Sequence, residues 1–376
     1  MLSCIVGLLF LLPFVQEKIY PLYHPEPLKG AIVESIHPDL SVANWFDGSY
    51  QDSLEHYFND HFGFRSTLVR ANNQVQFSLF RRAKANSVIV AKDNYLFEEN
   101  YLLATCGLDY QGAKEIEHMA TSLAEAAKIL LRDSIQLLTV LAPGKGTYCK
   151  EFIPERYLAF QKDSTNYESL RDALQQHGLE VLDFQEWFLE MKDTTSSPLF
   201  PRCGIHWSSW GQFIAADSLV GRIEQITRKK LPHFILDSST VQDENVNMDY
   251  DMGEGLNLLW PVKAFPLRYP HWHISPREES DSVKVLVIAD SYYWGLFNIG
   301  VSRDLFSNGR FWYYNEQVFP DSYQGQLMTR DLDYMAELRK YDVVVLLFTD
   351  ANLSRFPYGF PDKVLKAVHE SAVPGW

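Results

Sequence analysis

The sequence has only four cysteines, and no two of them are close enough together to suggest a metal site. They stand at Cys4, Cys106, Cys149 and Cys203, whereas structural zinc sites use cysteine pairs only a few residues apart. We therefore expect no metal site, and we expect no cofactor. Cys149 and Cys203 both adjoin candidate site loops, which makes them candidates for a disulfide in an oxidising compartment.

Basic residues are also scarce relative to acidic ones. The chain has 34 Lys and Arg against 48 Asp and Glu, for a formal net charge of -14. A nucleic-acid phosphate backbone is bound by clustered Lys and Arg. The one visible cluster, Arg228–Lys230, is typical of a solvated helix end, so the composition argues against a nucleic-acid partner.

No hydrophobic run in the sequence reaches the length of a membrane span. Residues 2–15 are almost entirely apolar and carry no charge, but they fall short of the roughly 20 residues that cross a bilayer. A secretory peptide would show a basic region first and a small-residue cleavage site afterwards. We interpret residues 1–16 as a truncated membrane anchor and residues 17–45 as a linker; the alternative is a buried start of a soluble fold.

Aromatic residues, in contrast, are abundant. They make up 14% of the chain, with 20 Tyr, 24 Phe and 9 Trp. Most of these rings must fill the core, but flat apolar faces with polar edges also suit sugar rings. The composition therefore favours, without establishing, a carbohydrate partner.

Helix and strand patterns alternate along most of the chain, which is typical of a parallel sheet with crossover helices. The periodicity predicts helices within 50–80 and over 113–132, 165–177 and 209–227, and strands at 88–90, 95–97, 135–141, 179–183, 283–289 and 343–349. We expect one α/β domain over 46–376, a three-layer, doubly wound, mainly parallel sheet. Residues 231–280 are predicted to be a loop-rich insertion.

A serine at the end of one predicted strand suggests a nucleophile. The buried run Val285–Ala289 leads into Asp290 and Ser291, and open α/β sheets bind ligands at the carboxyl ends of their strands. His206, just before the predicted helix 209–227, could reach the same edge. Serine needs a base to become a good nucleophile, so the pair predicts acyl transfer. Taken alone, an Asp-Ser pair is more often a helix cap.

The segment that contains His206 precedes the segment that contains Ser291 in the sequence. In this order of motifs the chain resembles the alginate O-acetyltransferase (AlgJ/AlgX-like) branch of the SGNH hydrolase superfamily. Ordinary members of that superfamily carry the serine block first. Three further stretches support the resemblance: Phe58–Arg65, Val140–Lys145 and Thr349–Leu353. It covers roughly residues 45–355 and implies an SGNH-hydrolase-like fold with a permuted motif order.

The resemblance also implies roles for individual residues. Ser291 would be the nucleophile, His206 the general base and then acid, and Asn352 an oxyanion donor beside the Ser291 or Tyr292 N–H. The candidates for substrate binding are Lys145, Arg65, Trp207 and Tyr292. For Lys145 and Arg65 the alternative is a structural ion pair or helix-end contact, and for Trp207 it is packing behind the histidine.

One position departs from the pattern of the branch. Its members carry Asp two places before the histidine, where this chain has Gly204. Such a carboxylate orients the imidazole and stabilises the imidazolium. The candidate replacements are Asp183, Asp290 and Asp350, or a backbone carbonyl.

The function that the resemblance implies is O-acetylation of a cell-envelope polysaccharide. The acetyl group would come from a membrane-bound O-acyltransferase, and the chain would be anchored by its N-terminal segment at the periplasmic face of the inner membrane. Two alternatives stay open: a carbohydrate acetylesterase of the same fold, and a catalytically weak glycan-binding relative.

Overall fold

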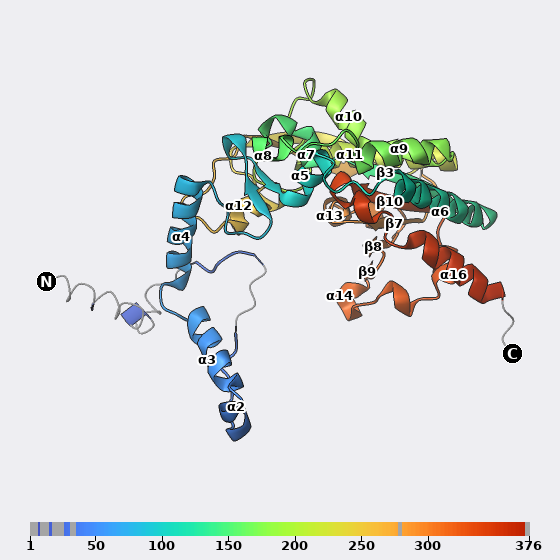
Figure 1. Ribbon diagram of the computed structural model, residues 1–376. Helices are drawn as coiled ribbons and strands as arrows, with labels where there is room; N and C mark the ends of the chain where they lie inside the picture. The colour runs from blue at the N-terminus through green and yellow to red at the C-terminus, as the bar shows by residue number, and fades with distance from the viewer. Residues whose placement is uncertain (1–6, 8–14, 17–25, 31–34, 277–279, 373–376) are drawn as a thin grey trace. The chain divides into compact units, whose positions relative to one another are not determined.

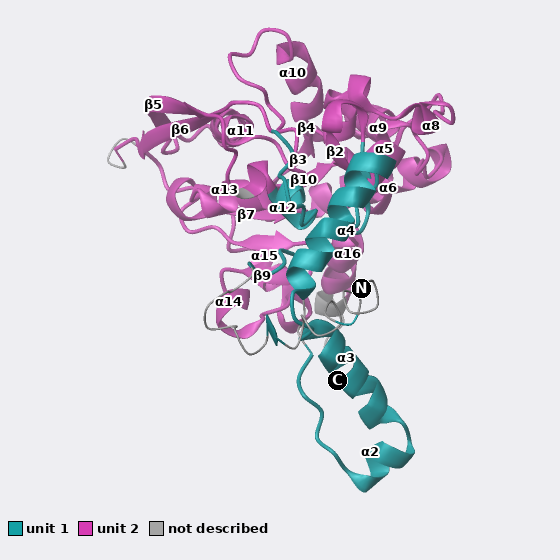
Figure 2. Cartoon of the chain, turned by 90° about the vertical axis from the view of Figure 1, so that its left-hand side faces the viewer, with its two compact units in different colours: residues 1–90, 251–263 teal, residues 91–250, 264–376 magenta. Residues whose placement is uncertain are grey.

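The computed structural model divides the chain into two compact units, coloured separately in Figure 2. Unit 1 comprises residues 1–90 and 251–263, and unit 2 comprises 91–250 and 264–376. These bounds differ from the predicted anchor, linker and single domain. The residues that the structure describes are 7, 15–16, 26–30, 35–276 and 280–372. Most of the predicted anchor therefore lies outside the described residues.

Unit 2 alternates helices and strands, as the sequence predicts, and unit 1 is mostly helical (Figure 1). The strands are β1 (Val88–Val90), β2 (Leu96–Glu98), β3 (Gln136–Ala142), β4 (Glu180–Asp183), β5 (Phe234–Gln242), β6 (Leu267–Ile274), β7 (Val285–Ala289), β8 (Phe311–Tyr313), β9 (Gln317–Phe319) and β10 (Val343–Thr349). The α-helices are α2 (Val42–Phe46), α3 (Ser49–Asp60), α4 (Arg65–Phe80), α5 (Glu99–Thr105), α6 (Ala113–Arg132), α7 (Lys145–Tyr148), α8 (Glu155–Leu158), α9 (Asn166–Gln176), α10 (Phe184–Met191), α11 (Ser209–Thr227), α12 (Asp251–Gly255), α13 (Tyr293–Asn298), α14 (Ser322–Gly325), α15 (Tyr334–Leu338) and α16 (Phe360–Ala372).

Six strands of unit 2 form one sheet in the order β4-β3-β10-β7-β8-β9. All neighbouring pairs are parallel except β8 and β9. β7 and β10 are buried along their whole length, which is why their sequences are almost continuously apolar. The prediction of a mainly parallel α/β sheet is confirmed.

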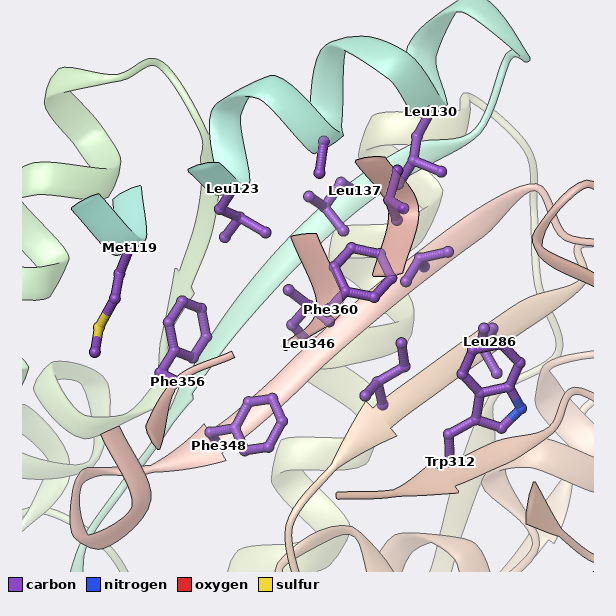
Figure 3. Packing of buried hydrophobic residues seen from close by; sticks show 14 of the residues in the cluster. Met119, Leu123, Leu130, Leu137, Leu286, Trp312, Leu346, Phe348, Phe356 and Phe360 are labelled. Carbon is purple, nitrogen blue, oxygen red and sulfur yellow. The ribbon is translucent and has the colours of Figure 1, made fainter. Parts of the chain in front are cut away.

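One face of this sheet packs against α6, α9, α15 and α16. Figure 3 shows Leu123 of α6 and Phe360 of α16 close to Leu346 of β10 in this cluster. Side chains alternate between the two faces of a strand, and the intervening residues Val345 and Leu347 are equally buried. The second face is therefore covered too, which gives the three predicted layers.

Residues 231–280 are more regular than the loop-rich insertion that we predicted. They contain β5 and β6, which pair antiparallel as a separate two-stranded sheet. β5 is exposed along nearly all of its length, so its sequence lacks the alternation of apolar and polar residues that marks a half-buried strand. Its pairing with β6 is a non-local contact that the local sequence does not reveal.

The parallel register brings several predicted site residues to one edge. Thr349 lies opposite Ala142, and Leu347 lies opposite Ala289. The segments that follow β3, β7 and β10 therefore all leave the sheet at the same edge.

Candidate active site

Ser291 lies in the turn between β7 and α13, at the carboxyl edge of the sheet. The turn is closed by the N–H of Tyr293, which donates to Asp290 O at 3.3 Å, and by the N–H of Trp294, which donates to Ser291 O at 3.2 Å. Ser291 itself is half-buried. This geometry holds the serine between a rigid buried strand and the first turn of a helix.

His206 meets this serine from a loop far away in the sequence. Its Nε2 lies 3.0 Å from Ser291 Oγ, and the residue is only 6% exposed. The loop continues into Ser208, whose side chain caps α11 by accepting from the Gly211 N–H at 3.1 Å. Nε2 can accept the serine proton only when the ring proton is on Nδ1. The pair thus has the spacing of a nucleophile and its general base.

Asp290, directly before the nucleophile, is fully buried at the centre of a hydrogen-bond network. Its Oδ1 accepts from the Tyr292 N–H at 3.0 Å. Its Oδ2 accepts from the Thr349 N–H at 2.8 Å, the Thr349 hydroxyl at 3.0 Å and Asn352 Nδ2 at 2.8 Å. Burial raises the pKa of Asp290, although the hydrogen bonds oppose that shift. Asp290 ties the Ser291 turn to the end of β10.

The structure uses the Asn352 amide within this network. Its Nδ2 donates to Asp290 Oδ2 and, at 3.3 Å, to Thr349 Oγ1, while its Oδ1 accepts from the Tyr358 hydroxyl at 3.2 Å. These two acceptors lie close together, since Thr349 Oγ1 is 3.0 Å from Asp290 Oδ2, so one of the two amide N–H groups can serve both. Because the Tyr292 N–H is bound to Asp290, the Ser291 N–H and the Asn352 amide are the candidate oxyanion donors at the nucleophile.

The three carboxylates predicted as partners of His206 bind other groups. Asp183 caps α10 through the Glu186 N–H and accepts from the Tyr167 hydroxyl at 2.7 Å. Asp290 holds the β10 turn as described above. Asp350 Oδ2 accepts from the Thr147 hydroxyl at 2.8 Å.

Three of the four substrate-binding candidates are buried. Lys145, Trp207 and Tyr292 are 1%, 0% and 0% exposed, so their side chains are enclosed by protein in this structure. Tyr292 donates its hydroxyl to Ile205 O at 3.2 Å, and its ring is 5.4 Å from that of Trp207. Arg65 belongs to unit 1, where it forms an ion pair with Asp60 at 3.1 Å.

Gly204 is explained by the segment that passes over it. A Cβ at this position would lie 2.3 Å from Met248 O and 2.9 Å from Asp249 C. The backbone at 248–249 therefore occupies the space that an aspartate side chain would need. Asp249, which the sequence analysis did not single out, is buried and accepts from the Ser209 hydroxyl at 2.8 Å.

Restoring the missing carboxylate should therefore harm the protein. We expect Gly204→Asp to lower the free energy of unfolding by about 1–3 kcal/mol, because overpacking displaces the backbone, and to slow acylation of Ser291. Urea unfolding and a rate assay check this. Gly221→Ala in α11 is the matched control, since a Cβ there has nothing within 4 Å. Faster acylation by Gly204→Asp would show that the space can accommodate a carboxylate.

Asp350 is a buried carboxyl group whose titration should be visible in stability. Burial raises its pKa to about 7, and it lines a cavity of about 410 Å³ together with Thr105, Thr147 and Asn166. A folded-state pKa above the unfolded value of 3.8 means that the folded protein binds this proton more tightly. The resulting stabilisation is complete below pH 3.8 and is lost as the pH rises through about 7.

Asp350→Asn should remove this dependence. Between pH 5 and pH 8, the wild type should lose at least about 1.4 kcal/mol relative to Asp350→Asn, the equivalent of one pKa unit. Urea unfolding of both proteins across this range measures the difference between their free energies of unfolding. The contributions of the other titrating groups are shared by both proteins and cancel in this difference. A gap that does not change with pH would mean that Asp350 is ionised throughout.

Three further findings concern cysteines, membrane spans and metal sites. Cys106, Cys149 and Cys203 are buried thiols, so the Cys149–Cys203 disulfide is not formed; Cys4 lies outside the described residues. Over the described ranges, no helix is both long and apolar enough to cross a bilayer. Within the same ranges, no three or more His, Cys, Asp or Glu side chains are grouped to hold a metal ion.

Comparisons with known proteins identify the family. The family model described as "SGNH hydrolase-like domain, acetyltransferase AlgX" matches residues 88–281, which include His206 and end before Ser291. A comparison with curated proteins gives no match.

Similar solved structures include the O-acetyltransferase domain of Pseudomonas putida AlgJ, with 14% identity, a TM-score of 0.48, and coverage of 76% of this chain and 99% of that one. Pseudomonas aeruginosa AlgX has 16% identity, a TM-score of 0.46 and coverage of 73% and 66%. Bacillus cereus PatB1 with a sulfonyl adduct has 11% identity, a TM-score of 0.44 and coverage of 72% and 97%. Since the family model spans more than half of the sequence, this chain belongs to the AlgX family of SGNH hydrolase-like acetyltransferase domains.

Proposed function

We propose that this chain is a polysaccharide O-acetyltransferase that works through an acetyl-enzyme on Ser291. The observation that supports it best is the 3.0 Å contact between His206 Nε2 and Ser291 Oγ. A serine that shares a hydrogen bond with a buried imidazole has the base that it needs to attack an acyl carbon. Membership of an acetyltransferase family favours acetyl as the group transferred.

In the first half-reaction, Ser291 Oγ attacks the carbonyl carbon of an acetyl ester while His206 Nε2 takes the hydroxyl proton. The N–H of Ser291 stabilises the oxyanion. As the intermediate collapses, the bond from carbon to the donor oxygen breaks, and that oxygen takes the proton from His206. The products are acetyl-Ser291 and the donor alcohol.

In the second half-reaction, a sugar hydroxyl attacks the acetyl-enzyme. His206 Nε2 takes the proton of that hydroxyl as the new carbon–oxygen bond forms. The bond between the carbon and Ser291 Oγ then breaks, and Oγ takes the proton back from His206. The enzyme returns to its starting state, and the sugar carries the acetyl ester.

The setting of this reaction rests on the sequence resemblance. The acceptor is an oligosaccharide or polysaccharide of the cell envelope, and the acetyl donor is a membrane-bound O-acyltransferase. The apolar segment at residues 2–15 would keep the chain at the periplasmic face of the inner membrane, close to that donor.

The alternative is an acetylesterase, in which water replaces the sugar hydroxyl in the second half-reaction. The same pair of residues serves both reactions, because they share one acyl-enzyme and differ in the acceptor that the cleft admits. Only the fate of the acetyl group distinguishes them.

The test is to incubate the full chain with 4-nitrophenyl acetate and a series of neutral and acidic oligosaccharides. We expect acetylated oligosaccharide by mass spectrometry, with none formed by Ser291→Ala. Release of acetate alone with every acceptor would support the esterase. An absence of both acetyl-enzyme and acetate would overturn catalysis and leave a glycan-binding protein.

A further inference from the structure

The loop that carries His206 is held at its main-chain carbonyls by side chains from three other segments. Lys145 Nζ donates to Arg202 O at 2.9 Å and to Gly204 O at 2.7 Å. The Tyr292 hydroxyl donates to Ile205 O at 3.2 Å, and Gln212 Nε2 donates to Trp207 O at 3.0 Å. The carbonyls on either side of His206 are thereby fixed.

Lys145 is the most unusual member of this set. Lysine is almost never fully buried, yet Lys145 is only 1% exposed. Its third hydrogen bond goes to Leu96 O at 2.7 Å, and the ring centroid of Phe97 lies 5.3 Å from its Nζ. An ammonium group has three N–H donors, so all three are used on main-chain carbonyls. This excludes Lys145 from binding a substrate as a donor in this arrangement.

The Lys145 ammonium group binds the backbone at position 204, where the AlgJ/AlgX-like branch carries its triad carboxylate. A triad carboxylate would orient the imidazole from this position, but Gly204 has no side chain and the backbone at 248–249 fills the space. The Gly204 carbonyl is held by Lys145 instead. A fixed backbone two residues before His206 limits how the ring can move relative to Ser291.

We infer that Lys145 is a positioning residue that acts through His206, holding Nε2 at Ser291 Oγ by fixing the backbone at 202 and 204. This inference rests on the proposed function. In this role, the buried Lys145 ammonium group influences the reaction through His206 and contacts no reacting atom. Displacement of a catalytic group by about 1 Å can lower the rate about 100-fold, so we expect removal of the Lys145 ammonium group to have an effect of that size.

The test is a double-mutant cycle on the rate at which 4-nitrophenyl acetate acylates Ser291 in the full chain. Lys145→Met should lower this rate about 100-fold in the wild-type background and by less than about threefold in the His206→Ala background. Residues that act as one unit show this non-additivity. A merely structural lysine would change the rate by the same factor in both backgrounds.

Lys192→Met is the matched control. Lys192 also donates to a main-chain carbonyl, Tyr148 O at 2.5 Å, and forms an ion pair with Glu151 at 2.8 Å, but it holds no carbonyl of the His206 loop. Its acylation rate should stay within about twofold of the wild type. If Lys145→Met does not fold, Lys145→Arg supplies donors to the same carbonyls with altered geometry and should lose about tenfold, again only when His206 is present.

The outcomes separate the two proposals. If wild-type Ser291 is never acylated, the proposed function fails. If wild-type Ser291 is acylated, but Lys145→Met lowers the rate equally with and without His206 or does not lower it at all, the positioning role of Lys145 alone is overturned.

Discussion

Replacing His206 by alanine is expected to slow acylation of Ser291 about a thousandfold. The imidazole is the base that lies 3.0 Å from the serine oxygen, and a positioned general base contributes roughly 100-fold to 10,000-fold. The loss should appear in kcat, because the ring contacts the reacting hydroxyl and not a remote part of the substrate. Burst kinetics with 4-nitrophenyl acetate measure the acylation step separately from turnover.

His177→Ala is the control for this variant. His177 also binds a side-chain partner, Glu117 at 2.8 Å, but it lies at the end of α9. Its acylation rate should equal that of the wild type. A His206→Ala enzyme that keeps more than a tenth of the wild-type rate would mean that another group removes the serine proton.

Asp290→Ala is expected to lower the free energy of unfolding by about 3 kcal/mol or more. The substitution would leave the buried N–H groups of Tyr292 and Thr349 without their acceptor, and each unsatisfied buried group costs about 1–3 kcal/mol. The Asn352 amide would lose its 2.8 Å contact as well. Because the Ser291 turn depends on this network, acylation should fall together with stability.

Urea unfolding of Asp290→Ala gives the stability, and the burst amplitude gives the fraction of competent sites. Asp172→Ala is a matched control, since this carboxylate is exposed and forms an ion pair with Arg171 at 2.9 Å. The free energy of unfolding of Asp172→Ala should stay within about 0.5 kcal/mol of the wild-type value. If Asp290→Ala were as stable as Asp172→Ala, the network would not hold the turn in the way described.

The elements that carry the reacting pair could be predicted because their signals are local. Helix α11 begins and ends where its pattern predicted, and Ser208 caps it by a hydrogen bond to the Gly211 N–H. Strand β10 coincides with its apolar run. A strand end and a helix start are both local features, whereas the contact between Ser291 and His206, 85 positions apart, was expected from the resemblance to the AlgJ/AlgX-like branch.

The surroundings of the pair depend on contacts that no local pattern records. Lys145 was predicted to bind substrate from the resemblance of Val140–Lys145 to a stretch of the AlgJ/AlgX-like branch, but three carbonyls from distant segments enclose its ammonium group. The glycine at position 204 is explained by the backbone at 248–249, which fills the space beside it and is not a neighbour in the sequence. The three-residue strands β8 and β9 are too short to show a periodicity.

Peptide mapping by mass spectrometry, after brief incubation of the wild-type chain with an activated acetyl ester, tests the central claim most directly. The account predicts one acetylated site, Ser291, whose labelling is lost in Ser291→Ala and strongly slowed in His206→Ala. An unmodified Ser291 in a folded wild-type protein, or equal labelling with and without His206, would contradict it.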